Sequence, residues 1–95
     1  MDLPVTGPLW YWRGPAPFHF VTVPEREAEM IASTAGLVSY GWGMIPVTVL
    51  IGRTRYTTSL WPKDGGYIVP VKAAVRKAET LDLDDVVTMV LTVAT

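Results

Sequence analysis

The stretch VTVLIGRTRYTTSLW, residues 47–61, determines the predicted fold of this 95-residue chain. Val47 to Ile51 is almost continuously apolar and β-branched, which is typical of a strand buried on both faces. Gly52 and Arg53 are predicted to form a two-residue turn of the kind that joins hairpin strands. Thr54 to Trp61 alternates strictly between its two faces, which predicts the second strand of the hairpin.

The same kind of pattern continues on both sides of this hairpin. Thirteen Val and eleven Thr favour strands, while eight Pro and eight Gly divide the chain into short segments. Asp64-Gly65-Gly66 is a strong turn signal. The other predicted strands are Leu9–Arg13, Phe18–Val23, Tyr67–Val69 and Val86–Val93.

Two short helices are predicted between these strands. Pro24 and the acidic residues that follow it favour a helix N-terminus, and helical spacing of apolar residues extends this helix over about 25–35. Pro70 is predicted to begin the second helix. The apolar face of that helix is formed by Val71, Ala74, Val75 and Ala78. Together the elements predict one domain, residues 1–95, that is mainly all-β: a small closed or nearly closed β-barrel of six strands with two short helices.

The composition is that of a folded globular domain. The chain is 49% hydrophobic and 18% charged, has a net charge of −1 and contains no cysteine. No apolar run is long enough to cross a bilayer, and the N-terminus lacks the features of a signal peptide. The near-neutral total disfavours non-specific nucleic-acid binding. We therefore expect a cytoplasmic protein, monomeric or homodimeric, without a membrane or nucleic-acid partner.

Several motifs resemble those of a known bacterial family. They are Phe18–Pro24, Gly41–Gly43, Ile51–Thr54, Thr58–Pro62 and, above all, Gly66–Glu79. Together they resemble the family called domain of unknown function 1905, over most of the chain from about Leu9 to Val93. The resemblance implies a small β-barrel with one or two helices and no established biochemical activity, and it supplies no catalytic residue.

The last third of the chain also resembles a strand–helix–strand unit of cradle-loop barrels. In that unit a Gly-Asp pair usually precedes the final strand, whereas this chain has Asp84-Asp85. Aspartate enters left-handed conformations less easily than glycine. We therefore expect a different turn at this point.

Charge is distributed unevenly along the chain. Residues 1–52 carry two basic and four acidic side chains, residues 53–77 carry six basic and one acidic, and residues 78–95 carry four acidic. The basic centre between two acidic ends is the strongest indication of a local anion site.

Three of the central cations form the candidate anion site. Lys72 and Arg76 are four residues apart, so they share a face of the second predicted helix, near an N-terminus that favours anions. Arg55 lies on the polar face of its strand and would complete a site for a carboxylate or phosphate. The alternative is a solvated basic face paired with the aspartates at 82, 84 and 85.

Aromatic residues are numerous for so small a domain. The set comprises Trp10, Trp12, Phe18, Phe20, Trp42, Tyr56, Trp61 and Tyr67. Trp42, between two glycines, and Trp61 are candidates for a hydrophobic pocket or a partner surface. The alternative is that the whole set fills the core.

His19 is the only histidine. It alternates with valines on its strand, which favours a structural role, and its functional alternative is acid–base catalysis near neutral pH. A single histidine with scattered carboxylates does not indicate a metal site, and no glycine loop fits a phosphate cofactor, so we expect neither. We predict a non-catalytic binding module for a small anionic or aromatic ligand, or for a protein partner. The alternative is a small pocket enzyme in which His19 is the acid–base and Arg or Lys orients an anionic substrate.

Overall fold

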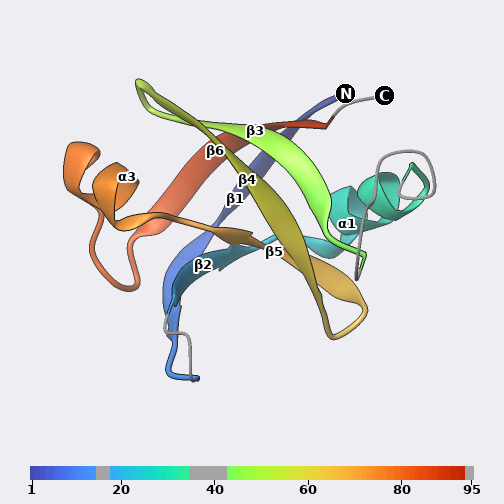
Figure 1. Ribbon diagram of the computed structural model, residues 1–95, viewed down its shortest axis with the longest axis horizontal. Coiled ribbons are helices and arrows are strands. Elements are labelled where there is room, and N and C mark those ends of the chain that lie inside the picture. The colour runs from blue at the N-terminus through green and yellow to red at the C-terminus, as the bar shows by residue number, and fades with distance from the viewer. Residues whose placement is uncertain (15–17, 35–42, 94–95) are drawn as a thin grey trace.

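The computed structural model describes residues 1–14, 18–34 and 43–93, and its strands close into a barrel (Figure 1). Around the barrel the order is β1-β2-β5-β4-β3-β6, and every neighbouring pair is antiparallel. Within the described residues the elements are β1 (Asp2–Trp12), β2 (Phe18–Thr22), α1 (Glu25–Ala32), β3 (Ile45–Ile51), β4 (Thr54–Lys63), β5 (Gly66–Pro70), α3 (Ala73–Ala78) and β6 (Val86–Val93). The predicted closed barrel with two short helices is confirmed.

The barrel interior is built from alternate residues of each strand. In β3, Ile45, Val47, Val49 and Ile51 are buried, and the residues between them are half-exposed. The prediction that this strand is buried on both faces was therefore wrong, because a barrel strand turns only one face inward. The interior is mostly aliphatic, with β6 adding every second residue from Val87 to Val93.

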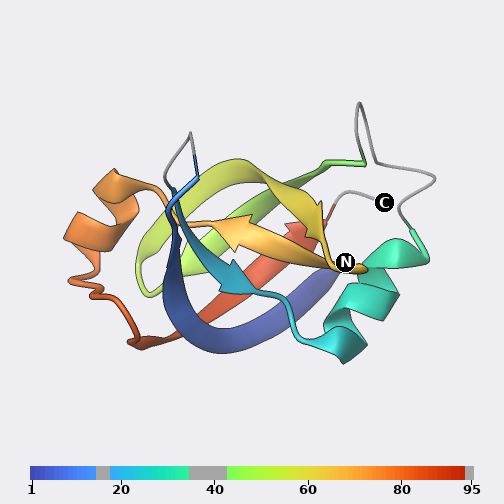
Figure 2. The same cartoon turned by 90° about the horizontal axis from the view of Figure 1, so that it is seen from below.

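Two long strands, β1 and β4, pair with one neighbour along the first part of their length and with the other neighbour along the rest. β1 pairs with β6 along Asp2–Pro8 and with β2 along Leu9–Trp12. β4 pairs in the same way with β3 along Thr54–Leu60 and with β5 along Trp61–Lys63. Strands that change partner form the corners of small barrels, and Figure 2 shows the strong curvature of β1.

The predicted first strand, Leu9–Arg13, was too short, because the structure starts β1 at Asp2. Pro4 and Pro8 read as strand breakers in the sequence. At one end of the β1–β6 ladder, Met1 forms main-chain hydrogen bonds with Val93, and at the other end Leu9 forms one with Asp85. Between these ends, every second residue of β1 belongs to a hydrogen-bonded pair. This alternation leaves both prolines in β1–β6 pairs that exchange no hydrogen bonds, so their missing N–H groups remove no bond from that ladder.

The helices lie at opposite ends of the barrel (Figures 1 and 2). α1 buries Ala28 and Ile31 and ends at Ala32, earlier than predicted, and the last predicted residue lies outside the described ranges. The second helix begins at Ala73 rather than at Pro70.

Pro70 is instead the last residue of β5, and its carbonyl accepts a hydrogen bond from the Tyr56 hydroxyl (2.8 Å). The predicted apolar face of the second helix is only half correct. Val71 and Val75 are buried, whereas Ala74 and Ala78 are exposed. The reason is that Val71 precedes the helix, so the helical spacing counted from it did not apply.

The turn before β6 contains the aspartates that replace the expected Gly-Asp pair. Asp84 itself adopts the left-handed conformation, with φ of 71°. The main-chain N–H of Asp82 donates to the carboxylate of Asp85 (2.8 Å) and holds the turn in shape. The turn therefore has a left-handed residue where the resemblance places a glycine, and the expected difference in conformation at this residue is not seen.

Candidate functional site

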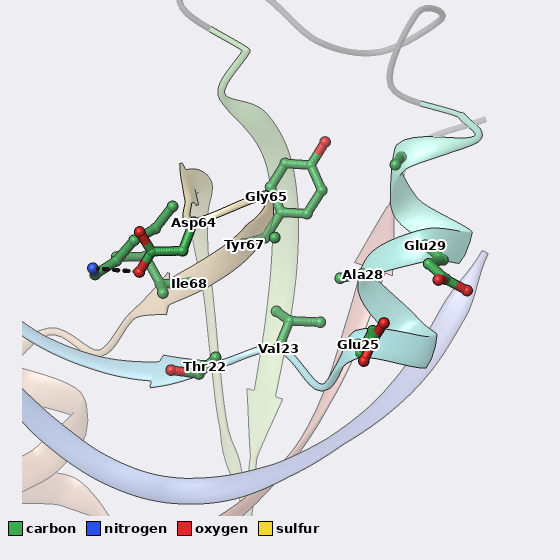
Figure 3. Close-up of a pocket in the computed structure, with 12 residues that line it drawn as sticks. Thr22, Val23, Glu25, Ala28, Glu29, Asp64, Gly65, Tyr67 and Ile68 are labelled. Carbon is green, nitrogen blue, oxygen red and sulfur yellow. Dashed lines mark hydrogen bonds and ion pairs between the residues drawn. The ribbon is translucent and has the colours of Figure 1, made fainter.

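A cavity of about 470 Å³ lies between α1 and the turn that joins β4 to β5 (Figure 3). This volume is within the range of small-molecule sites in proteins. Its lining comes from the end of β2, one face of α1, and the β4–β5 hairpin: Thr22, Val23, Glu25, Ala28, Glu29, Ala32, Lys63, Asp64, Gly65, Gly66, Tyr67 and Ile68.

The β4–β5 hairpin has the backbone conformation that a tight turn requires. Asp64 and Gly65 have φ of 51° and 80°, so both central residues are left-handed, as in the turns that suit twisted hairpins. The predicted turn at this position is confirmed. It places the Asp64 carboxylate at the cavity, opposite the helix.

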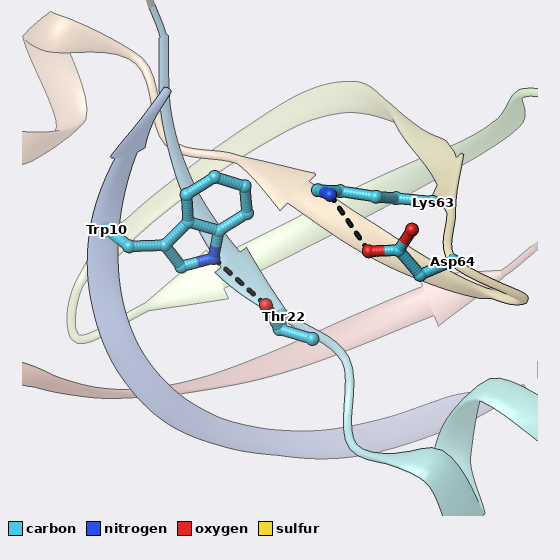
Figure 4. Close-up of polar contacts among 4 residues, drawn as sticks. All are labelled: Trp10, Thr22, Lys63 and Asp64. Atoms are coloured by element: carbon cyan, nitrogen blue, oxygen red, sulfur yellow. Dashed lines mark hydrogen bonds and ion pairs between the residues drawn. The ribbon is translucent and has the colours of Figure 1, made fainter. Parts of the chain in front are cut away.

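The polar lining of the cavity is mainly acidic. Glu25 and Glu29 are one helical turn apart on α1, so both reach the same side. Lys63, the only cation of the lining, forms an ion pair with Asp64, at 2.9 Å between Nζ and Oδ2 (Figure 4). No other ion pair is formed among the described residues, so both glutamates face the cavity without a cationic partner.

The inner surface of the cavity is apolar. Val23, Ala28 and Ile68 are buried, and Tyr67 is half-buried beside them. Thr22 accepts a hydrogen bond from the Trp10 indole nitrogen (2.9 Å), which connects the cavity to aromatic residues on the neighbouring strands (Figure 4). The cavity therefore combines an apolar floor with carboxylates at its mouth.

The aromatic residues next to this cavity lie on the outside of the barrel. Phe20 is fully buried there, although it does not belong to the interior core. It is covered by rings whose centroids lie 5.2–6.1 Å from its own. We call this group the outer aromatic cluster: Trp10, Trp12, Phe18, Phe20 and Trp61.

The aromatic set predicted from the sequence thus divides into two groups. Tyr56 and Tyr67 pack against the interior core, as core filling requires. Trp61 belongs to the outer aromatic cluster, 5.5 Å from Phe18 and 6.3 Å from Trp12. Trp42 lies outside the described residues, so its predicted pocket with Trp61 stays a prediction.

His19 lies on β2 at the other end of the barrel, near α3. Its ring centroid is 4.8 Å from that of Tyr11, and its carbonyl accepts a hydrogen bond from the Val71 N–H. Burial, and secondly the positive charge of Arg76, lower the pKa of His19 below its usual 6.5. The imidazole is therefore mainly neutral at pH 7, but His19 lines neither of the two cavities described here.

The three predicted anion ligands do not meet in either cavity. Lys72 donates to the main-chain oxygen of Thr57 (2.9 Å), and its Nζ lies 5.8 Å from the centroid of the Tyr56 ring. Arg76 lines a second cavity of about 310 Å³ together with Lys77 and Asp82. Arg55 is exposed on β4, opposite Leu50 of β3, and lines neither cavity. The three-residue anion site stays a prediction.

The acidic cavity has no counterpart among the sites predicted from the sequence. In the sequence, Glu25 and Glu27 indicate only a helix N-terminus, and the prediction makes no use of Glu29, four residues after Glu25. The missing information was tertiary: nothing in the local pattern places α1 beside the turn at Asp64. Within the described residues there is no group of three or more side chains placed to hold a metal ion.

The family model described as "Domain of unknown function (DUF1905)" matches residues 6–91. The chain belongs to this family. No curated protein matches the chain. In the described ranges, no helix has the length and apolar character needed to cross a lipid bilayer.

Proposed function

We propose that this member of the family is a non-catalytic binding module whose cavity beside α1 takes a small cationic ligand with an apolar body. The observation that carries the proposal is the pair of carboxylates, Glu25 and Glu29, that face the cavity without a cationic partner. A cationic group there would be attracted by both carboxylates. An anion would instead meet two like charges.

The apolar floor defines the rest of the ligand. Ile68, Val23 and Ala28 offer an apolar surface that a hydrocarbon or aromatic group can cover, and Tyr67 adds a half-buried ring. Sites for small molecules commonly combine such a surface with a few polar groups that fix the orientation. The proposed ligand is therefore cationic, whereas the basic centre of the sequence predicts an anionic ligand.

The test compares phenethylamine with 3-phenylpropionate, which share an aromatic body and differ in charge. Isothermal titration calorimetry and ¹⁵N-¹H NMR should show binding of the amine alone, with shifts at Glu25, Glu29 and Gly65. Binding should weaken at high salt, because the carboxylates are exposed. Equal binding of the two compounds would show that the carboxylates do not select the ligand.

Two protein variants locate the effect. The double variant Glu25→Gln/Glu29→Gln should weaken amine binding at least tenfold and keep the fold, since both side chains are exposed. Asp2→Asn removes a carboxylate of β1 that does not line the cavity and serves as the matched control. If the double variant binds the amine as tightly as Asp2→Asn does, the site is elsewhere.

A second candidate function is anion binding beside His19, because Arg76 lies close enough to lower the pKa of that imidazole. This candidate retains the predicted pocket enzyme in outline, with His19 as acid–base and Arg76 as the group that orients an anionic substrate. Inorganic phosphate bound at Arg76 should raise the pKa of His19, measured from its NMR signals. An unchanged His19 titration in saturating phosphate would exclude this candidate.

A further inference from the structure

The end of the β1–β2 hairpin extends beyond the closed part of the barrel. β1 and β2 remain paired up to Trp12 and Phe18, whereas the β1–β6 ladder stops at Pro8 and the β2–β5 ladder stops at Phe20. We call the two-stranded segment formed by residues 9–12 and 18–21 the arm. Figure 1 shows it projecting from the barrel below β2.

One edge of the arm has unpaired main-chain groups. The N–H of Leu9 donates to Asp85, and its carbonyl accepts from the N–H of Asp84 (2.9 and 2.8 Å), so both groups of Leu9 point away from β2. Main-chain groups two residues apart on a strand point to the same side. The N–H and C=O of Tyr11 therefore point to this edge too, and no residue in the described ranges bonds to them there.

The side chains around this edge are exposed aromatics. Tyr11 and Trp12 are 40% exposed and Phe18 is 42% exposed. Successive residues point to opposite faces of a strand, so Trp12 stands on one face of the arm and Tyr11 on the other. An added strand at the edge would thus be contacted by an aromatic ring on each of its faces.

We propose that this edge binds an extended segment of a partner protein as an added antiparallel strand centred opposite Tyr11. An extended backbone has a donor and an acceptor spaced to match both open groups of Tyr11. The exposed rings supply apolar contact in addition to these hydrogen bonds. None of the arm residues lines the acidic cavity, and the inference does not depend on the function proposed for that cavity.

A second copy of this chain fits the edge poorly. If two copies paired antiparallel about Tyr11, residue 13 of the second copy would lie opposite Leu9. The Asp84–Asp85 turn already occupies that edge of Leu9. The twofold axis would impose this collision twice, whereas a foreign segment needs only to end or turn away at that point.

Charges at the two ends of the edge define the partner further. Arg13 is exposed at the outer end, and Asp84 and Asp85 are exposed at the end nearer the barrel. An antiparallel segment starts beside Arg13 and finishes at the aspartates. The segment that fits best has an acidic residue first, β-branched residues in the middle and a basic residue last.

The probe is the acetylated and amidated peptide Glu-Thr-Val-Lys, in which the valine lies opposite Tyr11. In ¹⁵N-¹H NMR titrations the Tyr11 amide should move downfield and become protected from hydrogen exchange. Methylation of the valine nitrogen should weaken binding by about fivefold or more, because it removes one of the two strand hydrogen bonds. Methylation of the threonine nitrogen, which points away from β1, is the matched control and should change binding much less.

Two variants test the same bonds from the side of the protein. Tyr11→Pro removes the outward N–H without removing a bond to β2 and should lose the peptide, while Tyr11→Phe should retain it. If the proline variant unfolds, the pair of methylated peptides on the unaltered protein still decides the question. Equal affinity of the two methylated peptides, or shifts confined to residues away from the arm, would overturn the proposal. If the molecular mass of the protein doubles as its own concentration is raised, and the Tyr11 amide becomes protected without peptide, the edge binds a second copy instead.

Discussion

The barrel interior and the outer aromatic cluster are both apolar, but they are built differently. The interior is almost entirely aliphatic and closed to solvent, with residues such as Leu91 and Val49 fully buried. The cluster places aromatic rings around one fully buried residue, Phe20, and leaves Trp12 and Phe18 partly in contact with solvent. The difference indicates that the interior is a closed core, whereas the cluster covers the outside of β2 and leaves part of its apolar surface in contact with solvent.

Truncation of the buried residue in each region should produce the largest effects. Phe20→Ala should lower the free energy of unfolding by about 3–5 kcal/mol, and Leu91→Ala by about 2–5 kcal/mol, because both side chains are fully buried. Urea denaturation followed by circular dichroism measures both. A loss below 1 kcal/mol for Phe20→Ala would mean that the cluster does not behave as a second core.

Gly52 contributes through backbone conformation rather than apolar area. It has φ of 57° in the β3–β4 turn, and a Cβ there would meet the carboxylate of Glu79, which accepts a hydrogen bond from Thr54 (2.6 Å). Gly52→Ala should cost more than the about 1–2 kcal/mol of a left-handed non-glycine residue, because the added Cβ must also displace the Glu79 carboxylate. Thermal unfolding measures it, with Gly65→Ala as a control that has the same backbone penalty but no neighbouring atoms.

The exposed rim of the cluster should matter less for folding. Trp12→Ala removes ring contacts with Phe20 and Trp61 and should cost about 1–3 kcal/mol, since each such aromatic pair contributes about 0.5–1.5 kcal/mol. The same denaturation experiment should therefore rank Trp12→Ala below Phe20→Ala. Equal losses for the two variants would remove the distinction between a buried centre and an available rim.

His19 should have the smallest effect on the free energy of unfolding, and this effect can be followed through the titration of its imidazole. Its pKa in the folded state is lower than 6.5, so the native protein binds fewer protons than the unfolded chain. The stability contribution is complete above pH 6.5 and is lost as the pH falls through the folded pKa. NMR titration should give a pKa below 6.5 that rises in Arg76→Gln. A value at or above 6.5 in the unaltered protein would contradict the burial of this imidazole.

The fold was largely predictable because its signals are local. Alternation over Thr54–Trp61, the turns at Gly52 and Asp64, and the β-branched segment before β4 each specify an element without knowledge of its neighbours. The errors arose where hydrogen-bond pairing outweighed residue preference. Pro4 and Pro8 occupy positions of β1 that donate no hydrogen bond to β6, and Pro70 ends a strand instead of starting a helix.

The candidate site was much less predictable, because its parts come from separate segments. Glu29 and Asp64 are far apart in the chain, and the barrel order that places β5 between β2 and β4 brings them to one cavity. The outer aromatic cluster depends on the same order, which places Trp61 within 5.2 Å of Phe20. Side-chain periodicity shows which face of a strand a residue occupies, but not which strand will lie next to it.

The first and last strands of the barrel are neighbours, and main-chain bonds join Met1 to Val93. In a closed ring of this kind, any strand could be the first in the chain without loss of a strand pairing. A circular permutant that links these two positions and opens the Gly52–Arg53 turn would keep every strand pairing. Such a permutant would place new termini at the tip of the β3–β4 hairpin, and leave both the acidic cavity and the arm intact.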